Sequence, residues 1–311
     1  MIVPLIVAAG LTPAWQQIMT FDGFRAGEVN RAIDVRWCAS GKVLNVGIAL
    51  AHLGAASETI SLVGGTTGEQ IQREFRSLGI EASWVPIEAP TRVCTTILDL
   101  KTGAATELVE NAIAVDAAEL AAFRSLYSAR AQGAQMAILT GSLPAGAPHV
   151  FFRELLDGTA CPAIVDVRGP ELLAALERGV YLVKPNREEL ARTVGRKITD
   201  DAQLHSAMLE LNDRGAEWVV ISDGPRPAWA SSREQVFRLT PPRVEPVNPI
   251  GSGDCLAAGI AWALAEGSDT LAAIRLGMGA AAFNVGQLLP ARLDRDEVDR
   301  YAASVTCEQV R

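Results

Sequence analysis

The chain has 311 residues, of which 49% are hydrophobic, and a formal net charge of −8, so it can bury the core of a large α/β domain. Its acidic and basic residues are mixed along the chain, which leaves no basic stripe of the kind that nucleic-acid binding requires. Its five cysteines are widely spaced, odd in number and never arranged as CxxC, which argues against a disulfide framework or a zinc site and favours a reducing cytoplasm.

The N-terminal segment MIVPLIVAAGL predicts a buried first strand. It lacks the basic region of a signal peptide, and no run in the chain approaches the roughly 18 apolar residues of a membrane span, so we expect no membrane partner. Residues 12–38 and 91–110 predict short strands with turns and no helix between them. Such strands favour a small second sheet that covers one edge of the main sheet as a lid, rather than an independent domain.

The rest of the chain alternates short β-branched runs with helical patterns. The predicted strands are QMAILTG, PAIVDV, GVYLVKPN and EWVVISDG, and the predicted helices between them include FFRELLDG, PELLAALERG and DAQLHSAMLELNDRG. The segment from Gly251 to about Gln287 predicts two long Ala-rich helices. This alternation indicates βαβ units, and hence an α/β fold whose mostly parallel sheet has helices on both faces. We therefore predict one domain over residues 1–311, with the lid strands as part of it.

The stretch VNPIGSGD, residues 247–254, is a glycine-rich turn that leads into a helix. Gly251, Ser252 and Gly253 would offer backbone N–H groups to an anion, and the helix would add the positive end of its dipole. Asp254, beside that anion hole, is placed to accept a proton from an attacking hydroxyl while the hole stabilises a transferring phosphoryl group. The alternative is a structural turn whose acidic residue stabilises the helix dipole.

A second candidate site is KPNREEL, residues 184–190, which follows the strand GVYLV and opens a helix. Asn186 and Glu189 stand three residues apart, so both could face a hydrated Mg²⁺ on a nucleotide, because Mg²⁺ takes few protein oxygens and keeps waters. The same spacing is also that of a capping box, in which the two side chains only stabilise the helix start.

Positive side chains come from the irregular regions and from the loop before the helix in SGKVLNVGIALAHLG. Arg31, Lys42 and Arg92 would form a phosphate clamp on the lid and at its base, with Asn45 close to Lys42. The alternative for each is an ordinary solvated surface cation. No GxxxxGK[ST] loop and no GxSxG elbow is present in the sequence.

Taken together, GKVLNV, TR before a strand, LTGSLPAG, VKPNREEL, VVISDG and NPIGSGD occur in this order across nearly the whole chain. This set resembles the ribokinase-like (PfkB-type) carbohydrate kinases, and most of all the branch of tagatose-6-phosphate kinase and 1-phosphofructokinase. The resemblance implies a three-layer Rossmann-like sandwich with a small β-lid, the cofactors ATP and Mg²⁺, and homodimers joined through the lids.

The resemblance also implies roles for particular residues. Asp254 would be the catalytic base, Gly251 to Gly253 the anion hole, and Asn186 and Glu189 would organise Mg²⁺ and phosphates. Ser222 and Gly224 in VVISDG would contact the nucleotide. The substrate-binding positions would be Gln16, Arg31, Gly41, Lys42, Asn45 and Arg92.

Several residues depart from the family pattern. Gln16 in TPAWQ stands where the family usually has the aspartate of NPxxD, which binds sugar hydroxyls. Ser40 and Val43 replace glycines of GGKGxNV, and Pro227 replaces a later glycine of the nucleotide loop. These departures leave the phosphoryl-transfer residues in place but indicate an unusual acceptor pocket.

We therefore expect an ATP-dependent, Mg²⁺-requiring kinase that phosphorylates a hydroxyl of a phosphorylated hexose such as tagatose 6-phosphate or fructose 1-phosphate. One alternative is a kinase of an unphosphorylated sugar or a nucleoside, which Arg31 and Arg92 pointing away from the cleft would indicate. Another is a non-catalytic sugar-phosphate sensor that keeps the fold.

Overall fold

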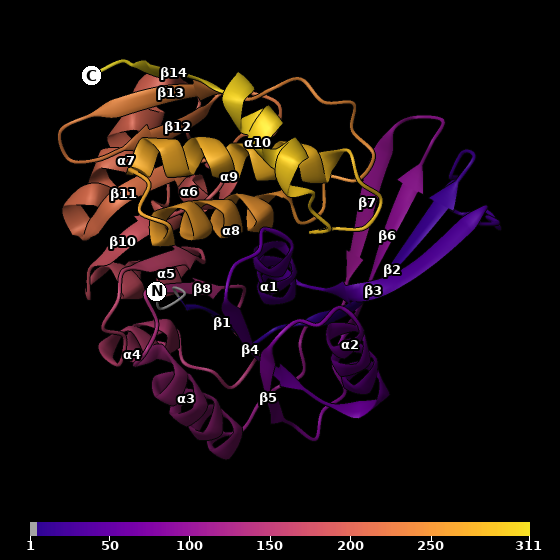
Figure 1. Ribbon diagram of the computed structural model, residues 1–311. Coiled ribbons are helices and arrows are strands. Elements are labelled where there is room, and N and C mark those ends of the chain that lie inside the picture. Colours follow the sequence, from indigo (N-terminus) through magenta and orange to yellow (C-terminus); the bar gives the residue numbers. More distant parts are fainter. Residues whose placement is uncertain (1–4) are drawn as a thin grey trace.

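The computed structural model describes residues 5–311 and contains two separate β-sheets (Figure 1). Residues 1–4 of the predicted first strand lie outside the described residues. The large sheet has the strand order β14-β13-β12-β11-β10-β9-β8-β1-β4-β5. Its strands are β1 (Ile6–Gly10), β4 (Ser57–Val63), β5 (Ala82–Pro86), β8 (Met136–Thr140), β9 (Ala163–Asp166), β10 (Val180–Val183), β11 (Ala216–Ile221), β12 (Ala228–Ser231), β13 (Val236–Thr240) and β14 (Thr306–Gln309).

Seven neighbouring strands of this sheet run parallel, namely β5, β4, β1, β8, β9, β10 and β11, and β12, β13 and β14 extend it as antiparallel strands. Strand β1, which lies between β8 and β4 inside the sheet, has the sequence IVAAG and is buried along its whole length. A run of apolar residues of this kind is typical of a parallel strand that is covered on both faces. The predicted α/β class, with a mostly parallel sheet and a smaller second sheet, is confirmed.

Helices pack on both faces of the large sheet, and each face has its own hydrophobic core. One core contains side chains of α1 (Lys42–His52), α2 (Gly65–Ser77), α8 (Ser252–Ala265), α9 (Thr270–Val285) and α10 (Arg295–Ser304). The other contains side chains of α3 (Ala117–Ala131), α4 (Phe151–Asp157), α5 (Gly169–Leu176), α6 (Arg187–Thr193) and α7 (Asp201–Arg214). The predicted Ala-rich pair is α8 and α9, and these helices pack closely because Gly259 has no side chain at their contact. A Cβ on Gly259 would stand only 2.7 Å from Gly277 Cα.

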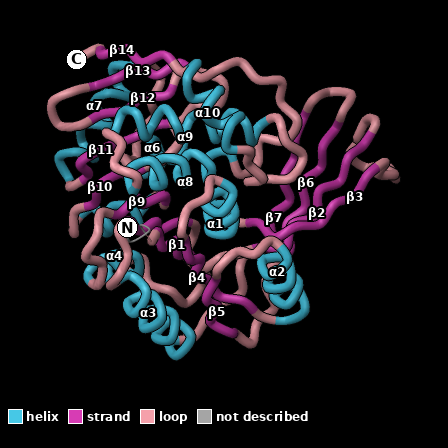
Figure 2. The backbone as a smooth tube through the Cα atoms, in the orientation of Figure 1, coloured by secondary structure: helices cyan, strands magenta, loops and turns pink. Residues whose placement is uncertain are grey.

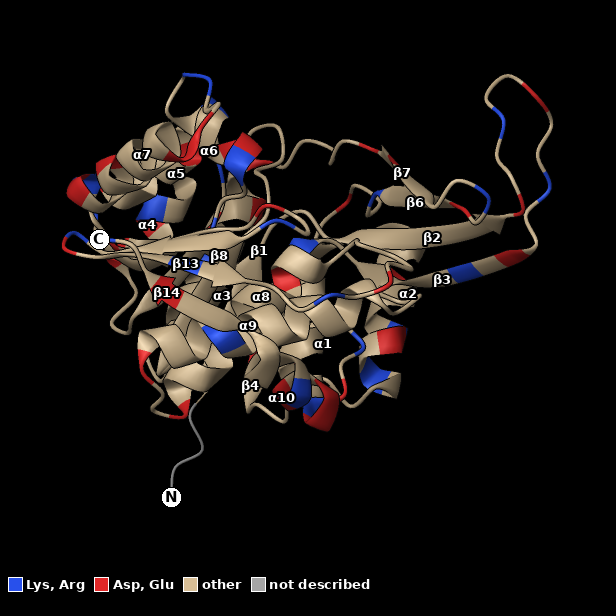
Figure 3. Ribbon diagram, turned by 90° about the horizontal axis from the view of Figure 1, so that it is seen from above, with Lys and Arg blue, Asp and Glu red and all other residues tan. Residues whose placement is uncertain are grey.

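The small sheet has the order β3-β2-β6-β7 and extends away from the large sheet (Figures 2 and 3). Its strands are β2 (Ala14–Phe21), β3 (Asp34–Ser40), β6 (Val93–Asp99) and β7 (Ala104–Val109). Its inner face packs through Ile18, Cys38 and Leu98 against Leu288 and Leu289, in the loop that follows α9.

The chain order of the parallel strands creates a crevice at one edge of the large sheet. After β1 the chain adds β4 and β5 on one side, and it later adds β8 to β11 on the other side. Open α/β sheets bind ligands outside the carboxyl ends of the strands at such a reversal. Within residues 5–311, no helix is long and apolar enough to cross a membrane.

Candidate active site

A pocket of about 650 Å³ lies at the carboxyl ends of the parallel strands, where the inner face of the small sheet meets them. The small sheet lines it with Cys94, Glu107 and Val109, and Arg92, just before β6, lines it as well. All but one of the residues to which the sequence analysis gave a catalytic or binding role also line it: Gln16, Gly41, Lys42, Asn45, Arg92, Asn186, Glu189, Ser222, Gly224, Gly251, Ser252, Gly253 and Asp254.

Arg31 is the exception, because the structure does not bring it to this pocket. It is exposed, in the segment that joins β2 to β3 at residues 22–33. That segment forms the far end of the small sheet, well away from the carboxyl edge of the large sheet (Figure 3). Within its own chain, Arg31 therefore does not complete the predicted clamp.

The turn before α8 has a conformation that requires glycine. Gly251 has φ 82°, in the left-handed region, and a Cβ there would come within 2.9 Å of Pro290 Cβ and 3.3 Å of Asn45 Nδ2. Asn248 holds the turn, since its Nδ2 donates to Leu288 O at 2.9 Å and its Oδ1 accepts from Ile250 N at 3.1 Å. The start of α8 therefore lines the pocket at a fixed position, and the Ser252 N–H donates to Pro249 O at 3.3 Å.

Asp254 lies in the first turn of α8 with only 6% of its surface exposed. Its Oδ2 accepts a hydrogen bond from Asn45 Nδ2 at 2.7 Å, and Asn45 Oδ1 in turn accepts from Ser40 Oγ at 3.1 Å. Burial raises the pKa of Asp254 to about 7; Lys42 opposes this shift and Asp166 adds to it. A carboxyl group with a pKa near neutrality is suited to accept and release a proton at physiological pH.

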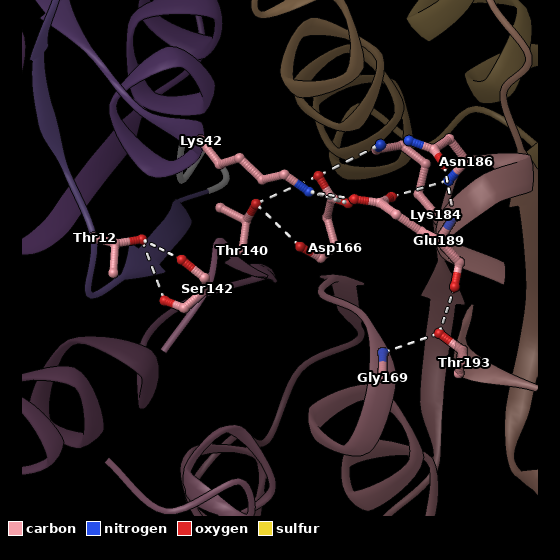
Figure 4. A network of polar contacts seen from close by, with 10 residues as sticks. All are labelled: Thr12, Lys42, Thr140, Ser142, Asp166, Gly169, Lys184, Asn186, Glu189 and Thr193. Atoms are coloured by element: carbon pink, nitrogen blue, oxygen red, sulfur yellow. Dashed lines mark hydrogen bonds and ion pairs between the residues drawn. The ribbon is translucent and has the colours of Figure 1, made fainter. Parts of the chain in front are cut away.

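A buried carboxylate, Asp166, connects two lysines at the floor of the pocket (Figure 4). Its Oδ1 lies 3.1 Å from Lys42 Nζ and its Oδ2 lies 3.4 Å from Lys184 Nζ. Burial alone would raise the pKa of Asp166, but the charges of Lys184 and Lys42 outweigh burial and lower it. Lys184 also adjoins the glycine turn, because a Cβ on Gly253 would lie 3.3 Å from its Nζ.

Asn186 and Glu189 form the capping box that their spacing allows. Asn186 Oδ1 accepts from Glu189 N at 2.8 Å, and Glu189 Oε2 accepts from Asn186 N at 3.1 Å. The second carboxylate oxygen, Glu189 Oε1, faces the pocket 3.6 Å from Lys42 Nζ. The two side chains therefore do cap α6, and one carboxylate oxygen of Glu189 is left to face Lys42 and the pocket.

The opposite end of the pocket is polar and close to the small sheet. Thr12 Oγ1 and Ser142 Oγ lie 3.2 Å apart, between the ends of β1 and β8 (Figure 4). The Arg92 guanidinium donates to Thr12 O at 3.0 Å, Glu110 O at 3.1 Å and Pro13 O at 3.3 Å. These contacts fix Arg92 at the base of the small sheet, with its side chain on the pocket wall.

Two further predicted residues lie at this end. Gly41 has φ +89°, and a Cβ there would come within 3.0 Å of Thr12 O, so glycine allows α1 to start against the Thr12 segment. Gln16 is 2% exposed and its Nε2 donates to Thr96 Oγ1 at 2.8 Å.

A second cavity of about 390 Å³ adjoins the first and shares Ser222, Gly224 and the glycine turn with it. Its walls are mostly apolar and include Val244, Leu256, Met278 and Val285. The two cavities together form a polar region and an apolar region on either side of the start of α8.

Sequence reasoning missed several pocket residues. They lie at the end of a strand of the large sheet or within two residues after it, and they are Thr12, Ser142, Asp166, Arg168 and Lys184. The signal was available for Asp166, which ends the predicted strand PAIVDV with a charge, and for Lys184, which directly follows GVYLV.

The fold and the pocket define an α/β enzyme with a buried carboxylate beside a glycine turn at a helix N-terminus. Residues 5–293 match the family model described as pfkB family carbohydrate kinase. The chain therefore belongs to this family of carbohydrate kinases, which confirms the family and the enzyme class that the sequence predicted.

Solved structures agree with this assignment. Phosphofructokinase-2 from Escherichia coli in complex with fructose-6-phosphate is 26% identical, with 97% of this chain and 99% of that chain covered and a TM-score of 0.87. The fold is also shared with a possible 1-phosphofructokinase from Thermotoga maritima, at 21% identity, coverage of 99% and 100% and a TM-score of 0.91. Ribokinase from Thermotoga maritima matches at 17% identity, coverage of 97% and 100% and a TM-score of 0.77.

Proposed function

We propose that this protein transfers the γ-phosphoryl group of ATP to a hydroxyl of a phosphorylated hexose. The observation that carries the proposal is Asp254, a buried carboxyl group with a pKa of about 7, held by Asn45 beside the N-terminus of α8. Asp254 accepts the proton of the acceptor hydroxyl as its oxygen attacks the γ-phosphorus.

The glycine turn and the lysines stabilise negative charge in this reaction. The N–H groups of Gly251 and Gly253 and the dipole of α8 would face the transferring phosphoryl group, while the Ser252 N–H donates to Pro249 O at 3.3 Å. Lys184, whose ammonium adjoins Gly253, adds a positive charge at the same place. Asp166 keeps both lysines in position through its two ion pairs. The small sheet, acting as the predicted lid, would exclude water from the reacting groups.

Mg²⁺ fits the oxygen groups at the floor of the pocket. Glu189 Oε1 faces the pocket, whereas both oxygens of Asp166 are paired with lysines, and Mg²⁺ prefers oxygen ligands and retains several waters. Glu189, with Asn186 at the same helix start, would hold a hydrated Mg²⁺ through water molecules together with the nucleotide. The ion would neutralise charge on the phosphates.

The apolar cavity next to the glycine turn is suited to a nucleotide base. Its apolar walls match the faces of an aromatic ring system, and it opens into the polar pocket where the phosphates would lie. Ser222 and Gly224, which line both cavities, would then contact the nucleotide between its base and its phosphates.

The acceptor would occupy the end of the pocket near the small sheet. Arg92, with Thr12 and Ser142, supplies a cation and two hydroxyl groups for an existing phosphate. Gln16 and Gly41 line the same end and would contact the sugar. The E. coli phosphofructokinase-2 structure with fructose-6-phosphate supports an acceptor of this class. Lys42 and Asn45 adjoin the sugar site while they orient Asp166 and Asp254.

A coupled assay of ADP release tests the proposal. The acceptors would be fructose 1-phosphate, fructose 6-phosphate, tagatose 6-phosphate and the corresponding unphosphorylated hexoses, with Asp254→Asn as the inactive control. We expect turnover with at least one sugar phosphate. Turnover with unphosphorylated sugars alone would favour the second candidate, a kinase for such sugars. Of the two arginines whose absence from the pocket would indicate that candidate, Arg31 lies outside the pocket and Arg92 lines it. Nucleotide and sugar-phosphate binding without turnover would indicate a sensor.

A homodimer through the small sheets is part of the proposal. Side chains alternate along a strand, so Val35 and Trp37 lie on the face opposite Gln16 and the pocket. Trp37 is 45% exposed and Val35 is 42% exposed, an apolar surface that a second copy would cover. Sedimentation of the wild type and of Val35→Lys tests this, since loss of the apolar contact should give monomers. A cytoplasmic location remains a prediction from the cysteine pattern.

A further inference from the structure

Four cationic side chains line the pocket, namely Lys42, Arg92, Arg168 and Lys184, and they differ in how they are neutralised. Both lysines form ion pairs with Asp166. Arg92 donates to three backbone carbonyl groups. Arg168 is exposed, and its guanidinium makes no hydrogen bond or ion pair with any part of the chain between residues 5 and 311. It is therefore the pocket cation that is most available to a ligand.

The backbone on both sides of Arg168 is held in place. Asp166, two residues earlier, is the last residue of β9 and forms ion pairs with Lys42 and Lys184. Gly169 N donates to Thr193 Oγ1 at 2.9 Å, and Thr193 Oγ1 donates to Glu189 O at 2.7 Å (Figure 4). Arg168 thus projects from a connection that is fixed to α6, the helix that Asn186 and Glu189 open.

This position lies at the nucleotide end of the proposed site. In Figure 4, Gly169 lies with Thr193 and Glu189, whereas Thr12 and Ser142 lie at the far end of the network. The acceptor's phosphate already has Arg92 near Thr12. The anionic group nearest to Arg168 would therefore belong to the nucleotide.

The pocket has more carboxyl groups than cations, so an arginine without an acidic partner matters for the binding of an anionic ligand. Five carboxyl groups line the pocket, against four cations, and they belong to Glu107, Asp166, Glu171, Glu189 and Asp254. A nucleoside triphosphate adds further negative charge at the same place. A guanidinium group can donate two parallel hydrogen bonds to phosphate oxygens, and such charge-assisted bonds are stronger than neutral ones.

We propose that Arg168 binds the terminal phosphoryl group of the bound nucleoside triphosphate and stabilises its charge during transfer; this deepens the proposed function and rests on it. In the transfer, the acceptor oxygen forms a bond to the γ-phosphorus, and the bond from that phosphorus to the β–γ bridging oxygen breaks. The electron pair of the broken bond leaves with the nucleoside diphosphate, and the proton of the acceptor goes to Asp254. Arg168 remains protonated throughout.

Calorimetric titration with three ligands tests the contact without any turnover. The ligands are adenosine, ADP and the ATP analogue whose β–γ bridging oxygen is replaced by NH, each with Mg²⁺. For Arg168→Ala we expect the analogue to bind about tenfold more weakly, with ADP changed by less than about twofold and adenosine unchanged. Arg168→Lys should lie between, because an ammonium group cannot make the paired contact. The control is Arg73→Ala, which removes an exposed arginine on α2, outside the pocket, and should change nothing.

Steady-state kinetics separates this contact from one to the acceptor. If Arg168 acts on the γ-phosphoryl group, Arg168→Ala lowers kcat while the KM for the sugar phosphate changes little. If Arg168→Ala raises the KM for the sugar phosphate and leaves the titrations unchanged, Arg168 binds the acceptor's phosphate and the proposal is overturned. If neither the titrations nor the kinetics change, Arg168 is a solvated surface residue. A wild type that turns over no sugar, yet shows the expected titration pattern, would overturn the kinase function and leave the Arg168 contact standing. A wild type that binds no nucleotide would overturn both.

Discussion

Asn45 Nδ2 donates a hydrogen bond of 2.7 Å to Asp254 Oδ2, although 209 positions separate the two residues in the sequence. Asn45 belongs to α1 and Asp254 to α8, two helices that pack together on the same face of the large sheet. Since Ser40 Oγ donates to Asn45 Oδ1, the orientation of the amide is determined by its two partners. The helix packing therefore sets the direction of the proposed catalytic carboxyl group.

Asp254→Asn should preserve the fold and nucleotide binding and lower kcat by roughly 10²- to 10⁴-fold, the usual contribution of a positioned general base. The amide oxygen can still accept from Asn45, so the helix packing should not change. The measurements are kcat in the coupled assay and the affinity for ADP by calorimetry. Near-normal turnover in this variant would remove Asp254 from the mechanism.

The same carboxyl group predicts a pH dependence of both activity and stability. Because burial raises the pKa of Asp254 to about 7, kcat/KM should decrease as the pH falls below about 7, where the base becomes protonated. Between pH 3.8, the ordinary pKa of this carboxyl group, and about pH 7, Asp254 is protonated in the folded chain and ionised in the unfolded chain. Its contribution to stability therefore decreases across this range and is lost as the pH rises through 7.

Asp254→Asn removes that ionisation from the buried site. Its free energy of unfolding should therefore exceed that of the wild type by more at pH 8 than at pH 5, on the order of a few kcal/mol at most. Urea unfolding of both proteins at the two pH values measures the difference. Equal differences at both values would show that Asp254 has an ordinary pKa.

The sequence predicted the layers of this fold because each buried strand is a short apolar run and the helices between the strands have their own periodicity. It also predicted the segment around Gly251, where the backbone geometry admits only glycine. It could not predict that Lys42 would pair with Asp166, 124 positions away, because the order of the strands brings them together. It placed Arg31 with the clamp because residues 22–33 contain no strand pattern that fixes their direction.

Asp166→Asn should impair both stability and catalysis. The variant leaves Lys184, which is 3% exposed, without its carboxylate partner, and an unpaired buried charge is costly by about 3–5 kcal/mol. The wild-type pKa of Asp166 is lowered by the lysines, so its contribution is present above the ordinary pKa and is lost as the pH falls below it. Thermal unfolding at pH 7 measures the loss; a variant as stable as the wild type would contradict the importance of the pair. Glu188→Gln, which alters an exposed carboxylate on α6, is the control.

Arg92→Ala should raise the KM for the sugar phosphate by about 10-fold or more and leave the KM for ATP nearly unchanged, since a charge-assisted contact contributes about 1.5–3 kcal/mol. Arg92 also holds the carbonyl groups of Thr12, Pro13 and Glu110, so its removal should loosen the small sheet. Arg92→Lys keeps the charge but cannot make all three contacts, and should give an intermediate KM. An equal rise of both KM values in Arg92→Ala would indicate a structural defect in place of a lost phosphate contact.

Gln16 is the most informative departure at the acceptor end. Its Nε2 donates to Thr96 Oγ1, while a carboxylate at this position would accept hydrogen bonds from two sugar hydroxyls at once. We expect the wild type to work poorly on fructose 1-phosphate and tagatose 6-phosphate, because a neutral amide offers one weaker acceptor and also a donor. Gln16→Asp should then increase kcat/KM for one of them about tenfold, which corresponds to roughly 1.4 kcal/mol.

Two further variants separate charge from length in this test. Gln16→Asn has the length of aspartate without its charge, and Gln16→Glu has the charge with the length of glutamine. If charge and reach both matter, neither variant should match Gln16→Asp in kcat/KM. If the wild type already uses either ketohexose phosphate with ordinary efficiency and Gln16→Asp brings no gain, the amide is a neutral replacement. The choice of acceptor must then depend on other residues of the pocket, among which Ser40 differs from the family pattern and lines the same wall.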